Sequence, residues 1–129
     1  MNSKKYIQVG EFYIGIKPTE VCTILGSCVA VCLYDRLERI GGMNHYLIPL
    51  WNGKGLQSPK YGNIAIHRLI EGMVNIGCRI ENFEAKVFGG GNVIDTVSQE
   101  SMMVGRKNIV IAQEVLDEYR IPVTARDVG

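Results

Sequence analysis

One run of apolar residues constrains this chain more than any other feature. Residues 29–34, with the sequence VAVCLY, are nearly all apolar and follow a break at Gly26 and Ser27. A strand that lacks the usual alternation of apolar and polar residues is expected where both faces of a sheet are covered. The run therefore predicts a buried strand inside a layered fold.

Strand and helix patterns alternate along the rest of the chain. Apolar and β-branched runs at 6–9 and 12–16, separated by Gly10 and Glu11, predict a hairpin. Helical spacing predicts one helix from Asn63 to a stop at Gly77 and a second helix that starts near Asn108. Further strands are expected at residues 21–25, 40–48, 83–88 and 121–125. Strands on both sides of two amphipathic helices predict a layered mixed α/β domain.

Length and composition exclude several classes of protein. The chain has 129 residues, which is typical of a single domain, so we expect one domain over residues 1–129. A net charge of +1 gives no electrostatic case for nucleic acid or for an anionic membrane surface. No signal-like segment and no stretch of about 18 apolar residues occurs. We therefore expect a cytoplasmic protein without membrane insertion, whose four cysteines stay reduced.

A cysteine and a histidine are the candidates for chemistry. Cys28 lies between the Gly26-Ser27 break and the buried strand, so its thiol is expected at a tight turn beside exposed backbone amides. A thiol becomes a nucleophile when a group that titrates near neutrality takes its proton, and only His45 and His67 qualify. His45 lies on the strand expected to pair with the one after Cys28, whereas His67 lies on a helix, off the apolar stripe. His45 is therefore the preferred base.

Structural roles stand beside the chemical ones. Free cysteine often behaves as a small buried hydrophobe, which suits Cys32 and Cys78. Taken alone, His45 is better explained as a structural histidine than as a base, and the expected strand pairing with the Cys28 segment makes the two explanations about equal. The spacers between Cys22, Cys28 and Cys32 do not match the short CxxC hairpins of structural zinc sites, so no metal is expected.

Two glycine-containing segments are expected to be loops. Residues 89–91 with Asn92 lack the Lys-Ser/Thr of a phosphate loop, and we expect a close-packed turn near the site. Residues 51–60 carry no period and are expected to form an exposed loop. Trp51 in that loop is a candidate contact for a helical substrate.

The segments around Cys28 and His45 form a specific pair. They read LGSCVAVCLYD and GGMNH, and in this combination the chain resembles the chemoreceptor glutamine deamidases of the CheD family. The segments that resemble the family, in the family's order, lie at residues 25–35, 41–45, 60–63, 84–90, 105–108 and 125–129. The resemblance covers essentially the whole chain.

The resemblance implies an activity and its residues. The activity is hydrolysis of the side-chain amide of particular glutamines on methyl-accepting chemotaxis receptors, which produces glutamates and needs no metal or organic cofactor. Cys28 is the implied nucleophile, His45 its base, and a threonine on the preceding strand orients the histidine. Thr23 is the candidate for that third role. An ungapped count instead places Cys22 there, which is a weaker hydrogen-bond partner.

The resemblance also implies a fold and leaves alternatives open. The fold is a single-domain, three-layer α/β sandwich with a mixed sheet, similar to the catalytic domains of deamidating bacterial toxins. Family members usually continue beyond residues 127–129, so this protein is either a short member or carries a tail in its full-length form. Because the family also binds a CheC-type phosphatase, a mainly non-catalytic module that binds receptors and CheC is the alternative function. A redox thiol that pairs Cys28 with Cys22 or Cys32 is a third.

Overall fold

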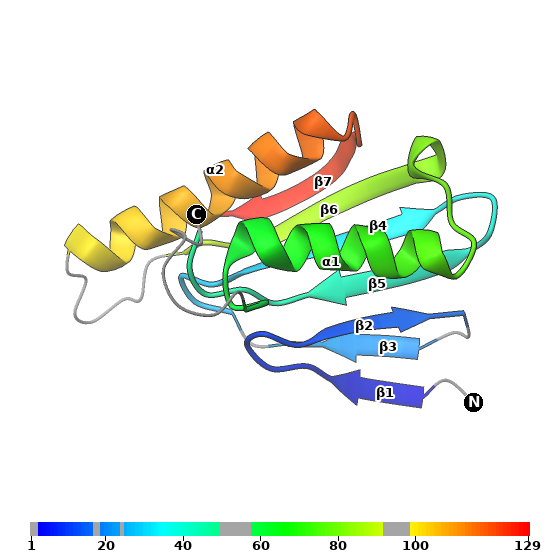
Figure 1. The fold of residues 1–129 in the computed structure, drawn as a ribbon. Coiled ribbons are helices and arrows are strands. Elements are labelled where there is room, and N and C mark those ends of the chain that lie inside the picture. Colours follow the sequence, from blue (N-terminus) through cyan, green and yellow to red (C-terminus); the bar gives the residue numbers. More distant parts are fainter. Residues whose placement is uncertain (1–2, 17–18, 24, 50–57, 92–98) are drawn as a thin grey trace.

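The buried strand predicted from the apolar run is the middle of a sheet. The computed structural model describes residues 3–16, 19–23, 25–49, 58–91 and 99–129. In it, β4 (Val29–Asp35) pairs antiparallel with β5 (Ile40–Asn44) and with β6 (Phe83–Gly89). β2 (Phe12–Gly15) and β7 (Val123–Val128) complete a five-stranded sheet in the order β2-β5-β4-β6-β7 (Figure 1). The sheet is mixed, because β6 and β7 run parallel.

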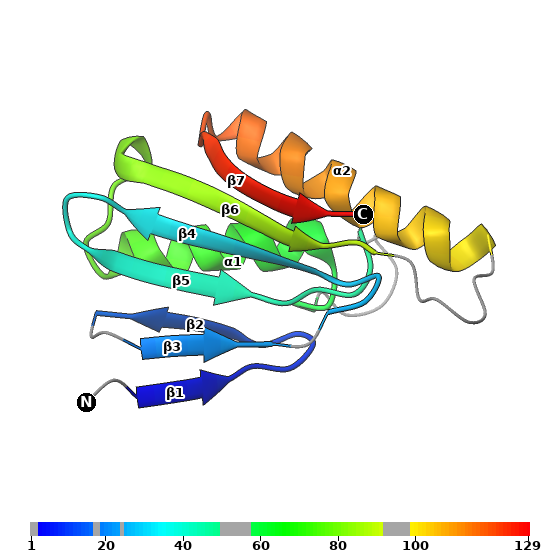
Figure 2. The same ribbon diagram turned by 180° about the vertical axis from the view of Figure 1, so that it is seen from behind.

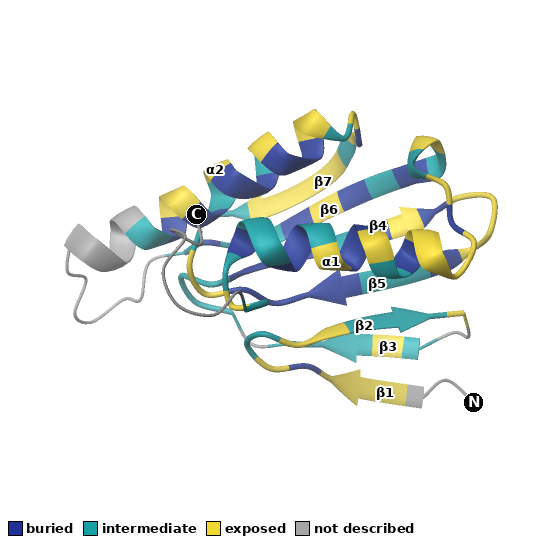
Figure 3. Cartoon of the chain, viewed as in Figure 1, coloured by how far each residue is buried: buried dark blue, intermediate teal, exposed yellow. Residues whose placement is uncertain are grey.

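The helices α1 (Gly62–Asn75) and α2 (Gln99–Glu118) cover one face of this sheet, as the two views in Figures 1 and 2 show. Buried positions of α1 recur every three or four residues, and Figure 3 shows them alternating with exposed ones. They are Gly62, Ala65, Ile66, Leu69, Ile70 and Met73. Val74, expected on the same stripe, is 40% exposed instead. The helices and the sheet enclose the larger hydrophobic core.

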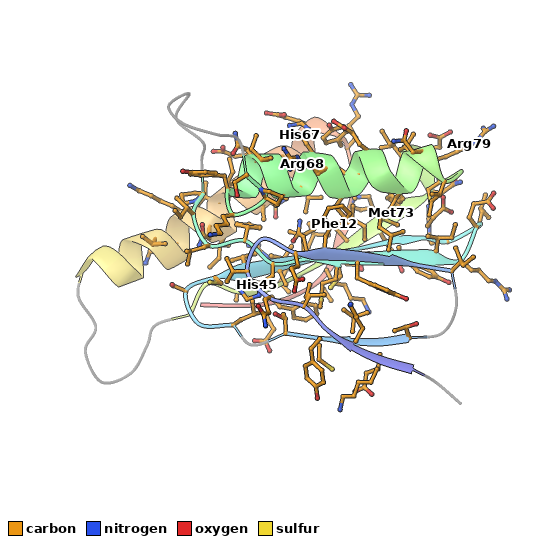
Figure 4. All side chains as sticks on the ribbon, turned by 60° about the horizontal axis from the view of Figure 1, so that its bottom comes forward. Phe12, His45, His67, Arg68, Met73 and Arg79 are labelled. Atoms are coloured by element: carbon orange, nitrogen blue, oxygen red, sulfur yellow. The ribbon has the colours of Figure 1, made fainter. Side chains whose placement is uncertain are left out.

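A smaller sheet covers the other face. β1 (Ser3–Tyr6) and β3 (Thr19–Cys22) pair parallel as a two-stranded sheet, below the main sheet in Figure 4. Ile7, Ala30 and Met43 form a second, smaller buried cluster between the two sheets. Helices, main sheet and small sheet make three layers, so the predicted three-layer α/β fold is confirmed.

The predicted hairpin of residues 6–9 and 12–16 is wrong, because its two strands belong to different sheets. β1 pairs with β3, and β2 pairs with β5. The chain between them turns at Gln8 and Glu11, and Gly10 N–H donates to the His45 carbonyl at 2.8 Å. The connecting residues are thus bound to the main sheet, which moves β1 out of reach of β2.

The second helix begins nine residues before the predicted start near Asn108, at Gln99. Gly105 lies inside this helix. A Cβ at Gly105 would lie 2.7 Å from the Gly90 carbonyl oxygen, so a glycine lets α2 approach the segment after β6. Tertiary packing therefore outweighs the weak helix propensity of glycine here.

Other boundaries differ by a few residues. The strand predicted at 40–48 is observed as β5, which ends at Asn44. Beyond it, Tyr46 forms an isolated bridge with Val29. The final strand, predicted at 121–125, is β7 at Val123–Val128, and a short 3₁₀ helix, Ile80–Asn82, precedes β6. The predicted loop with Trp51 lies almost wholly outside the described residues.

Candidate active site

Cys28 lies on a turn that backbone hydrogen bonds attach to the segment after β6. Gly90 N–H donates to the Cys28 carbonyl at 2.8 Å, and Gly91 N–H donates to the Gly26 carbonyl at 2.9 Å. A Cβ at Gly89 would lie 2.2 Å from the Cys28 carbonyl oxygen, and its φ of +104° also favours glycine. The prediction that this glycine run packs near the cysteine is confirmed.

His45 directly follows β5, beside the strand that begins after Cys28. Val29 and Tyr46 form an antiparallel bridge with N···O distances of 3.1 and 2.9 Å, which sets His45 opposite Ala30. Side chains alternate along a strand, so positions 28 and 30 share a face with position 45. Ala30 packs in the smaller cluster, so this is the face covered by the small sheet. Figure 4 shows His45 on this side of the main sheet.

The Thr23 hydroxyl determines which imidazole nitrogen of His45 carries the proton. Thr23 Oγ1 donates to the Ile7 carbonyl at 2.8 Å and lies 2.6 Å from His45 Nδ1. A hydroxyl has one proton, so Oγ1 accepts from Nδ1–H. Nε2 is then unprotonated and able to act as a base; it is buried and has no hydrogen-bond partner among the described residues.

No hydrogen bond joins Cys22 to the histidine in the part of the chain that the structure describes. Its Sγ hydrogen-bonds Glu20 Oε1 at 3.9 Å instead. Of the two candidates for the third position, the structure brings Thr23 to His45.

Burial keeps both reactive groups neutral. It raises the pKa of the Cys28 thiol above its ordinary value of 9.0, while a hydrogen bond from the residue's own backbone amide acts in the opposite direction. Burial also lowers the pKa of His45 below 6.5, since a buried imidazolium loses hydration. At neutral pH the pair is therefore a thiol and a neutral imidazole.

Asn108 is a residue that sequence reasoning missed. It is fully buried on α2, and its Nδ2 donates to the Ser27 and Leu47 carbonyls at 2.9 Å each. Tyr46 OH donates to the Asn108 backbone carbonyl at 2.6 Å. Its sequence context is an ordinary polar residue in an amphipathic helix, so only the tertiary contacts show its connection to the cysteine turn.

Two hollows open on the surface. The larger, about 800 Å³, is lined by residues that include Tyr13, Cys32, Tyr34, Arg39 and Lys86 but neither Cys28 nor His45. The smaller, about 330 Å³, is lined by residues that include Gly26, Gly89, Gly91, Phe88 and Asp127 and likewise by neither Cys28 nor His45. The smaller hollow is beside the cysteine turn, which makes it the better placed of the two for a substrate side chain.

Comparison with known proteins identifies the family. The family model described as CheD chemotactic sensory transduction matches residues 49–129. A protein of Sulfurimonas denitrificans, named "Probable chemoreceptor glutamine deamidase CheD", is 52% identical over 98% of this chain and 81% of its own length. A protein of the same name from Trichlorobacter lovleyi is 48% identical over 98% of this chain and 78% of its own length. The chain belongs to the CheD family.

The other titratable candidates of this CheD-family chain lie elsewhere. His67 Nδ1 hydrogen-bonds the Tyr119 hydroxyl between α1 and α2, and Figure 4 shows it on the opposite side of the main sheet from His45. Cys78 is buried in the larger core, and Cys32 is half-buried. Burial raises the pKa of both thiols to about 11.

Two features are absent from the described part of this CheD-family chain. No group of three or more His, Cys, Asp or Glu side chains is arranged to hold a metal ion in the described segments. Across the same residues, no helix is long and apolar enough to span a membrane.

Proposed function

We propose that this protein hydrolyses the side-chain amides of specific glutamines on chemotaxis receptors to glutamates, in the cytoplasm. The observation that carries the proposal is the hydrogen bond from His45 Nδ1–H to Thr23 Oγ1, which leaves Nε2 as a base on the sheet face of Cys28. A cysteine with an oriented neutral histidine is a set of groups suited to acyl transfer from an amide. The names of the relatives supply the substrate class.

In the proposed first step, Cys28 Sγ attacks the glutamine carboxamide carbon while its proton passes to His45 Nε2. The carbonyl oxygen becomes an oxyanion, which backbone N–H groups of the cysteine turn would stabilise. When the C–N bond breaks, the His45 imidazolium gives its proton to the leaving nitrogen. The products are ammonia and a thioester between Cys28 and the former glutamine side chain.

In the proposed second step, water hydrolyses the thioester. His45 Nε2 takes a proton from the water as its oxygen attacks the carbonyl carbon. The C–S bond breaks, the imidazolium returns its proton to Cys28 Sγ, and glutamate is released. Thr23 holds the imidazole in one orientation and one tautomer through both steps.

The test is mass spectrometry of a receptor cytoplasmic fragment incubated with the protein. Conversion of glutamine to glutamate is expected with the wild type and with Cys32→Ala, but not with Cys28→Ala. Cys32 is a matched control because it lies on β4, four residues after Cys28. Equal conversion by the wild type and Cys28→Ala would disprove the role of Cys28.

A second role, binding of a CheC-type phosphatase, is a proposal that rests on the family resemblance. Phosphatase binding becomes the main function if two results are found together. Neither the wild type nor Cys28→Ala converts glutamine to glutamate on receptors from the same organism, and Cys28→Ala still binds the phosphatase. The third hypothesis, a redox role for Cys28, requires a second cysteine with which Cys28 forms a disulfide. It is excluded if a Cys22→Ser, Cys32→Ser double variant keeps full activity.

A further inference from the structure

We propose that Asn108 is a positioning residue, whose carboxamide orients the Ser27–Cys28 peptide and fixes the spacing between the cysteine and histidine segments. The inference rests on the proposed function only in taking Cys28 as the nucleophile. Asn108 is 0% exposed, and both protons of its Nδ2 are used, one on the Ser27 carbonyl and one on the Leu47 carbonyl. One side chain thus connects the residue before Cys28 with the residue two after His45.

This connection lies where the described backbone pairing of the two strands ends. Val29 and Tyr46 exchange two backbone hydrogen bonds, and Leu47 N–H donates to Lys60 rather than to the cysteine segment. Beyond this pair, the Asn108 carboxamide bridges carbonyls of the two segments. Without it, the hydrogen bonds described between residues 26–28 and the rest of the chain would all go to the segment after β6.

The carboxamide also determines where the Cys28 N–H points. In a trans peptide the N–H is directed opposite to the preceding carbonyl. Asn108 holds the Ser27 carbonyl on the side of α2, so the Cys28 N–H faces away from α2. This amide is the one best placed to donate to an oxyanion formed at Cys28.

The local structure brings Asn108 to this position at a cost in stability. Gly105, one turn earlier, lets α2 approach Gly90, and Tyr46 OH donates to the Asn108 backbone carbonyl. Asn108 Oδ1, however, is buried with no hydrogen-bond partner among the described residues. An unpartnered buried oxygen destabilises a fold. Stability alone therefore does not account for an asparagine here, whereas the two donated hydrogen bonds do.

The test uses Asn108→Leu, which keeps the shape of the side chain and removes both donors. We expect a folded protein whose kcat for receptor deamidation falls about 100-fold, the loss typical of a mispositioned oxyanion donor, with KM changed far less. We also expect alkylation of Cys28 by iodoacetamide, located by peptide mass spectrometry, to shift to higher pH. A merely structural residue would not move that pH profile in a folded variant.

Two controls and a second variant make the result decisive. Gln113→Leu removes a carboxamide of the same helix that bonds Asp117 on the exposed side, and should change neither readout. Tyr46→Phe removes the bond to the Asn108 backbone but keeps both Nδ2 donors, so it should lower stability without shifting the profile. Asn108→Ser keeps one donor and should give an intermediate shift if Asn108→Leu does not fold.

The outcomes separate this inference from the proposed function. Wild-type kcat and a wild-type alkylation profile in the folded Asn108 variants would overturn the positioning role. A shifted alkylation profile together with a wild type that converts no receptor glutamine would overturn the proposed function and leave the positioning role intact.

Discussion

At the scale of single residues, the Cys28 thiol and the His45 imidazole are both uncharged before substrate binds. Burial disfavours both the thiolate of Cys28 and the imidazolium of His45, so the two groups are neutral together. In the proposed mechanism, charge would develop during attack, when the thiol proton would move to Nε2. This differs from sites in which a cysteine and a histidine form a stable ion pair.

The neutral pair predicts a pH profile. His45 acts as a base only when it is neutral, and burial lowers its pKa below 6.5. We expect kcat/KM for deamidation to fall on the acid side with an apparent pKa below 6.5 and to stay level from there to about pH 8. Initial rates on a receptor fragment across this range would check it. An apparent pKa above 6.5 for the fall in kcat/KM on the acid side would contradict a buried, neutral His45 as the base.

The Thr23 hydroxyl predicts a second effect. Thr23→Val keeps the shape of the side chain and removes the acceptor for His45 Nδ1–H. The loss of one hydrogen bond of about 1 kcal/mol corresponds to a fall in kcat of roughly fivefold, with little change in KM. Thr23→Ser restores the hydroxyl and should recover most of the rate. Equal rates for the Val and Ser variants would exclude an orienting role.

Sequence reasoning at this scale identified candidates but not all of their contacts. Cys28 and His45 follow from local motifs, because each lies in a short, distinctive segment. The choice between Thr23 and Cys22 depends on which of two neighbouring strand positions faces the main sheet, which local sequence does not reveal. Asn108 depends on contacts across more than 60 positions in the chain.

At the scale of elements, one buried carboxylate holds the turn between β4 and β5. Asp35 Oδ1 accepts from the Leu37 and Glu38 N–H groups at 2.9 Å, and Oδ2 accepts from Arg79 N–H at 3.0 Å. Asp35 is 0% exposed. Burial pushes its pKa up, but these N–H groups and a hydrogen bond from Cys78 outweigh burial, so the pKa is lowered below 3.8.

Asp35→Asn should therefore destabilise the protein by about 2–3 kcal/mol at neutral pH, since charge-assisted bonds to backbone N–H groups are lost. A carboxylate with a lowered pKa stabilises the fold above its unfolded value and loses that effect as pH falls through the folded value. The difference in the free energy of unfolding should thus shrink below about pH 3.8. Urea unfolding at neutral and acid pH, with Glu38→Gln as an exposed control, measures it.

The elements themselves were largely predictable where packing follows local periodicity. α1 matches its prediction because its apolar spacing is regular, and the central strand β4 matches because its apolar run is continuous. The predicted hairpin and the start of α2 were wrong for a common reason. Pairing of β1 with β3 and the approach of Gly105 to Gly90 are contacts between distant segments, and these outweigh the local patterns.

At the scale of the whole molecule, the candidate site lies between the main sheet and the small sheet, which are held by hydrophobic clusters of different size. Cys28 and His45 belong to the main sheet, which shares the larger core with both helices. Thr23 directly follows β3 of the small sheet, which is attached through a much smaller cluster. The small sheet is therefore expected to open before the main sheet does.

Amide hydrogen exchange under native conditions checks this order. We expect β1 and β3 to exchange about tenfold or more faster than β4 and β6, because they form a two-stranded sheet with few buried contacts. Deamidase activity should likewise disappear at a lower urea concentration than the helical circular dichroism. Equal protection of both sheets would show that the layers open as one unit.

The bond between Thr23 and His45 joins the small sheet to the main sheet, and this gives the molecule an intrinsic spectroscopic reporter. The chain has two histidines, and the other one, His67, bonds a tyrosine on the helical side. Nitrogen-edited NMR of the two imidazoles would therefore show a deshielded, slowly exchanging Nδ1 proton of His45 only while the layers are docked. The tautomer of a single ring thus reports whether the two halves of the site are assembled, without any attached probe and before any substrate is known.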